Sequence, residues 1–123
     1  MDTRRDSRET VMAESKNGGE WRRVVLVEGP PLELMELSGG PATKARYGSQ
    51  THGHKMLVDG TVWARMLGVM EQGVSDATRQ LFADMDDNGP YLSDLMDLFD
   101  RRGEHYAYIA WTGSGDVALR GGL

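Results

Sequence analysis

The chain has 123 residues, a formal net charge of -5, and 39% hydrophobic and 27% charged residues. This length and composition are typical of one globular domain and exclude collagen, a coiled coil and wholesale disorder. No apolar run reaches the ~18 residues of a membrane helix, the charged N-terminus lacks an apolar signal stretch, and cysteine is absent. We therefore expect a cytoplasmic protein without membrane association, disulfides, thiolate nucleophiles or a bound cofactor.

The first 19 residues carry four basic and four acidic side chains but few large apolar ones. Such a segment buries too little surface to offset the entropy lost on ordering. The pattern predicts a flexible tail over residues 1–19, followed by a single domain over residues 20–123.

β-Branched and apolar runs predict three strands in the first half of the domain. The first spans Trp21 to Val27 and is followed by the strand-breaking sequence Gly29-Pro30-Pro31. The second spans Leu32 to Leu37, and the third spans His54 to Val58. Between the last two, residues 38–53 contain four glycines and form a long connection without a predicted element.

The pattern over residues 61–72 supports two interpretations. Asp59-Gly60 is a favoured hairpin turn, whereas Val62, Trp63, Met66 and Met70 have the spacing of one helical face. We favour the helix because the periodic matches outnumber the single turn signal.

Helical spacing continues after residue 72. A second helix is predicted from Ser75 to before Asn88-Gly89, and a third, starting near Pro90, ends at Gly103. Strands are then predicted from His105 to Trp111 and from Asp116 to Arg120. Strands at both ends with helices between them predict an α+β fold, a small antiparallel sheet with about three helices packed on one face.

Acidic residues are concentrated in one segment. From Glu71 to Asp100 there are eight acids and a single base, Arg79. This charge disfavours direct nucleic-acid binding and attracts a basic protein surface. The candidate partner-binding residues are Asp84, Asp86, Asp87, Asp94 and Asp97.

Two histidines offer the alternative chemistry. His52 and His54 are two residues apart, so on a strand they point to the same side, and a carboxylate such as Asp59 or Asp84 could complete a metal site. The sequence lacks a nucleophile elbow, a phosphate loop and a complete calcium loop, because Leu95 stands where that loop needs glutamate.

These features favour a small noncatalytic interaction module. It would be an inhibitor, adaptor or regulator, of the kind that phages, viruses or mobile elements encode, using its acidic helices against a basic partner. The alternative is a metal-dependent enzyme or sensor that uses His52 and His54 with a carboxylate.

Overall fold

The computed structural model describes residues 9–83, 91–115 and 117–120, with no side-chain description for Glu71 and Arg120. The strands are β1 (Glu9–Asn17), β2 (Glu20–Val27), β3 (Leu32–Gly39), β4 (Thr51–Val58), β5 (Ala107–Thr112) and β6 (Val117–Arg120). The helices are α1 (Pro41–Tyr47), α2 (Gly60–Leu67), the 3₁₀ turn η1 (Glu71–Gly73), α3 (Val74–Leu81) and α4 (Leu92–Arg101).

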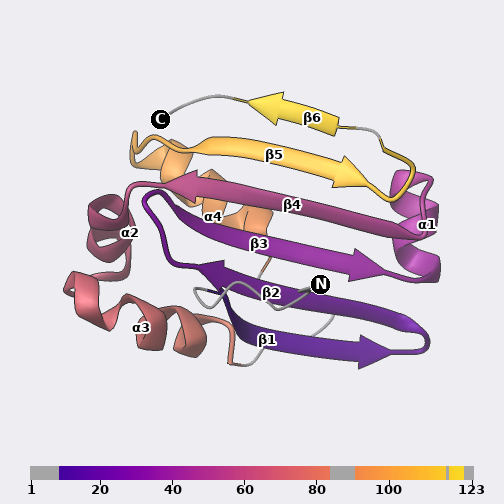
Figure 1. Cartoon of the computed structure of the whole chain (residues 1–123), viewed down its shortest axis with the longest axis horizontal. Coiled ribbons are helices and arrows are strands. Elements are labelled where there is room, and N and C mark those ends of the chain that lie inside the picture. Colours follow the sequence, from indigo (N-terminus) through magenta and orange to yellow (C-terminus); the bar gives the residue numbers. More distant parts are fainter. Residues whose placement is uncertain (1–8, 84–90, 116, 121–123) are drawn as a thin grey trace, which may run out of the picture.

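The strands form one six-stranded sheet in the order β1-β2-β3-β4-β5-β6 (Figure 1). Every neighbouring pair is antiparallel. The chain leaves this meander twice, once for α1 between β3 and β4, and once for α2 to α4 between β4 and β5. The α+β prediction is confirmed, and the described residues contain four α-helices where about three were predicted.

The additional helix is α1, which lies in the glycine-rich connection that was predicted to have no regular structure. Pro41 occupies its first turn, and Gly48 ends it with a φ of 75°. The Glu20 carboxylate accepts hydrogen bonds from the backbone N–H groups of Ala42 and Thr43 and from the Thr43 hydroxyl. Glu20 thus satisfies N–H groups at the start of α1 from a distant strand, a contact that local sequence patterns do not reveal.

The predicted flexible tail is wrong for residues 9–17, which form β1. This strand pairs with β2 along its whole length, with an irregularity between Val11 and Ala13. Met12 enters the core and is 5% exposed. One buried side chain and a full ladder of backbone hydrogen bonds order this edge strand despite its polar composition. Residues 1–8 lie outside the described part of the chain.

Residues 60–67 are helical, which confirms the helix over the hairpin. Asp59 precedes α2, and its carboxylate accepts a hydrogen bond from the Thr61 backbone N–H at 2.8 Å. Hydrogen bonding by the Thr61 side chain, followed by the Thr61 backbone N–H, lowers the pKa of Asp59 below its ordinary value. The dipeptide that suggested a hairpin turn therefore supplies the N-cap of a helix.

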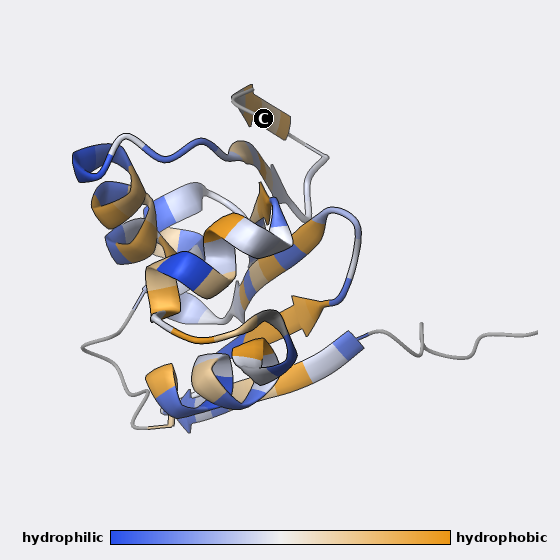
Figure 2. Ribbon diagram, turned by 90° about the vertical axis from the view of Figure 1, so that its left-hand side faces the viewer, coloured by the Kyte–Doolittle hydropathy of each residue, from blue (hydrophilic) through white to orange (hydrophobic). Residues whose placement is uncertain are grey.

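The core lies between α2, α3 and α4 and one face of the sheet. Figure 2 looks along the sheet from the end where α2 and α3 lie and shows the helices on one side of the strands. Trp63, Phe82, Phe99, Leu26, Leu34 and Met56 are among the fully buried side chains. Among the described residues, no helix is long and apolar enough to cross a membrane.

Candidate functional site

The helix-covered face of the sheet changes from apolar to polar along its strands. Val24, Leu34 and Met56 belong to the core cluster. Two residues further along each strand, on the same face, lie Arg22, Glu36 and His54. All three of these polar residues are buried, at 7% to 8% exposure. The structure therefore places a charged cluster directly beside the hydrophobic core.

Glu36 is the centre of this cluster. One carboxylate oxygen lies 2.7 Å from His54 Nε2, and the other lies 3.5 Å from Arg22 Nη1. The second oxygen also accepts a hydrogen bond from the Leu92 backbone N–H at 3.2 Å, in the first turn of α4. On the far side of the ring, His54 Nδ1 lies 2.8 Å from the Tyr108 hydroxyl. Glu36 thus connects three strands to the start of α4.

His52 lies beside this cluster, but its side chain is only partly buried and packs against α1. Its ring stacks on Tyr47 of α1, with centroids 3.6 Å apart and planes 5° from parallel. Burial, followed by the charges of His54 and Arg46, lowers the pKa of His52 to about 4, although Glu36 opposes the shift. His52 is therefore neutral near pH 7. It lines a cavity of about 340 Å³ together with Arg22, Tyr47 and Tyr91.

The two candidate metal ligands lie close together but have different roles. Their ring centroids are 5.3 Å apart. Both nitrogens of His54 already have protein partners, Glu36 and Tyr108. Within the described residues, no group of three or more His, Cys, Asp or Glu side chains is arranged to hold a metal ion. Metal binding by His52 and His54 stays a prediction, and it would require His54 to give up one of these partners.

The candidate acidic surface is only partly described. Asp94 and Asp97 are exposed on α4, and the Asp94 carboxylate accepts a hydrogen bond from the Tyr91 backbone N–H at 3.0 Å. Asp94 therefore also stabilises the start of its helix. Asp84, Asp86 and Asp87 lie outside the described residues. Partner binding through these five aspartates stays a prediction.

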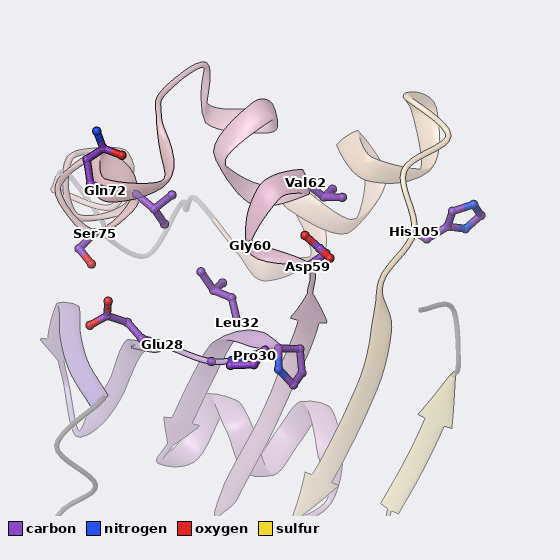
Figure 3. A pocket seen from close by; sticks show the side chains of 12 residues that line it. Glu28, Pro30, Leu32, Asp59, Gly60, Val62, Gln72, Ser75 and His105 are labelled. Carbon is purple, nitrogen blue, oxygen red and sulfur yellow. The ribbon is translucent and has the colours of Figure 1, made fainter.

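A second cavity, of about 850 Å³, opens between the β2–β3 turn and the starts of α2 and α3 (Figure 3). Its polar side chains are spread around the rim. Asp59 is engaged as the N-cap of α2, and His105 points away from Glu28 and Ser75 in the close view. Ligand sites usually combine an apolar wall with convergent polar groups. This cavity lacks that convergence among the described residues that line it.

The opposite face of the sheet carries a large apolar surface. We call it the open face, because none of the described helices packs on it (Figures 1 and 2). By strand alternation its apolar residues are those that face away from the core: Val11, Trp21, Val25, Val27, Met35, Leu37, Leu57, Ile109, Trp111, Val117 and Leu119. Val117 and Leu119 are 61% and 73% exposed.

Two indole rings on this open face lie against glycines of the neighbouring strands. Trp21 is paired with Gly39, and Trp111 is paired with Gly53. A Cβ atom at either glycine would collide with the neighbouring indole, and at Gly53 it would also collide with Leu37. The glycines therefore provide space for rings that cover the adjacent strand. The result is a broad aromatic and aliphatic surface around Leu37.

The charges of the open face balance. Its acidic residues are Glu9, Glu14 and Glu33, and its basic residues are Lys16, Arg23 and Lys55. Arg23 Nε lies 2.8 Å from a Glu14 oxygen, and Lys55 Nζ lies 2.6 Å from a Glu33 oxygen. The described strand residues of this face have no net charge, although the chain carries -5.

Sequence reasoning missed both Glu36 and the open face. One signal was available, since Val24-Val25-Leu26-Val27 is apolar at successive positions, and a strand with one solvated face alternates instead. Val25 and Val27 on the open face are 5% and 7% exposed. The pairing of each tryptophan with a glycine depends on strand register, which no short sequence pattern contains.

Comparison of the chain with protein-family models, with curated proteins and with solved structures finds no match.

Proposed function

We propose that the chain is a noncatalytic protein-interaction module that binds its partner through the open face. The observation that carries this proposal is a sheet face rich in apolar side chains, with two indoles and no described helix above it. On this face Val117 and Leu119 are exposed, Val25 and Val27 are buried, and the other apolar residues are partly exposed. Large exposed apolar patches are uncommon on monomeric proteins and mark interaction sites. Tryptophan and methionine are also enriched in protein interfaces.

The polar cluster supports a noncatalytic role. Glu36 accepts bonds from three groups of the chain itself, and both nitrogens of His54 have protein partners. A general base needs a free acceptor atom toward its substrate, and Glu36, although it lines the cavity of about 340 Å³, already accepts from these three groups. The geometry assigns the cluster a structural role, because it connects the start of α4 to the sheet.

A matched pair of substitutions tests the interaction proposal. Leu119 on the open face is 73% exposed, and Met70, between α2 and η1, is 70% exposed. Both Leu119→Lys and Met70→Lys add a lysine at a site with little core contact, so both variants are expected to fold. Wild type and the Met70 variant, immobilised, are expected to capture the same partner from a lysate of the source organism, and the Leu119 variant is expected to lose it.

Two further results would contradict this proposal. Equal capture by both variants would show that the open face does not bind the partner. Loss of capture on Asp97→Asn, together with a steep dependence on salt, would place the contact on the acidic surface of α4 instead.

A further inference from the structure

We propose that the partner of the open face is a second copy of this chain, packed sheet against sheet about a twofold axis. The inference rests on the proposed function, because it names the partner of the same surface. In a twofold dimer the same patch meets itself, so the patch must be complementary to its own side chains. Three properties of the open face meet this condition.

The first property is its charge. Two copies of a chain with a net charge of -5 repel each other overall. The described strand residues of the open face have equal numbers of acidic and basic side chains. Glu33 and Lys55 already form an ion pair within one copy. Two such faces can approach without net repulsion, while the excess negative charge stays elsewhere on each copy.

The second property is its area. Six strands about 4.8 Å apart, with about seven residues each at about 3.3 Å per residue, give a face of roughly 25 Å by 23 Å. Side-chain relief makes the accessible area of such a face larger than its flat projection. A stable interface of ordinary size buries about 800 Å² on each partner. The flat projection of roughly 570 Å² is most of that area, so the open face can form the greater part of a dimer interface.

The third property is its shape. The indoles of Trp21 and Trp111 lie against Gly39 and Gly53 of the neighbouring strands, where any other side chain would collide with them. Aliphatic side chains such as Leu37 and Ile109 lie between and beside them. Two sheets pack about 10 Å apart with the side chains of their inner faces interdigitated. Packing of this kind would place the helices of both copies on the outside.

Sedimentation velocity over a range of concentrations tests the inference, using wild type, Leu119→Lys and Met70→Lys. Wild type and the Met70 variant are expected to sediment as a dimer of the 13.6 kDa chain. The dimer of the Leu119 variant is expected to have a dissociation constant at least about tenfold higher than that of wild type, because the substitution places an unpaired ammonium group in an apolar interface. Leu37 lies at the centre of the face, so Leu37→Lys, with its fold verified by circular dichroism, is expected to abolish the dimer.

The outcomes separate this inference from the proposed function. A wild-type chain that stays monomeric at every concentration, yet captures another protein in a Leu119-dependent manner, would overturn the second copy and leave the interaction proposal standing. A monomer whose capture is the same for both lysine variants would overturn both. A dimer that persists in the Leu119 and Leu37 variants would place the interface elsewhere and overturn the inference.

Discussion

Replacing Trp63 by alanine is expected to lower the free energy of unfolding by about 3–5 kcal/mol, the usual range for a large aromatic side chain in a packed core. Trp63 is 1% exposed and stacks near Phe99, with ring centroids 5.7 Å apart. Its indole N–H donates to the Thr78 hydroxyl at 2.9 Å, and Thr78 is itself fully buried. The substitution would leave both a cavity and an unpaired buried hydroxyl.

Urea denaturation measures this effect. Trp63→Phe is the control, because it keeps much of the packing and removes the hydrogen bond, with an expected loss of about 1–2 kcal/mol. Phe99→Ala removes the other ring of the pair and is also expected to cost about 3–5 kcal/mol. Tolerance of either alanine variant within ~0.5 kcal/mol would mean that the helix faces are assigned wrongly.

Replacing Glu36 by alanine is expected to cost about 3–5 kcal/mol, because it leaves buried charge and buried donors without their partner. The groups affected are the His54 ring, the Arg22 guanidinium and the Leu92 backbone N–H. Arg22 and His54 are only 8% and 7% exposed, so most of their polar surface depends on partners within the chain.

Glu33 provides the matched control for this prediction. It lies on the same strand as Glu36 but on the open face, and its partner is Lys55, with both side chains about one quarter exposed at 23% and 24%. Glu33→Ala is expected to cost less than about 1 kcal/mol, as for other ion pairs near solvent. Equal losses at the two positions in thermal or urea unfolding would show that the Glu36 cluster does not stabilise the fold.

The sequence predicted those elements that can be identified from the apolar pattern within the element itself. The spacing of Val62, Trp63 and Met66 predicted α2, and the apolar runs after Trp21 and from His54 predicted β2 and β4. These patterns reflect burial of one helical face or a whole strand, which depends little on the rest of the chain.

The remaining elements depend on contacts between distant residues. β1 is polar and is ordered by pairing with β2, and α1 begins where Glu20 accepts its N–H groups. The candidate site is of the same kind, because Glu36 meets His54 only through the register of β3 and β4. His52 and His54 were identified by composition, but their actual partners were not predictable from spacing.

We expect the open face to be covered by protein in solution, and tryptophan fluorescence measures this coverage directly. Of the three tryptophans in the chain, Trp63 lies in the core, so Trp63→Phe leaves only Trp21 and Trp111, both on the open face. As the concentration of this variant rises, we expect its emission to shift to shorter wavelength and its quenching by acrylamide to decrease. When Leu119→Lys is added to this variant, the emission should stay, at every concentration, at the wavelength measured for the dilute protein. Emission and quenching that are independent of concentration, and equally strong quenching with and without Leu119→Lys, would contradict the account.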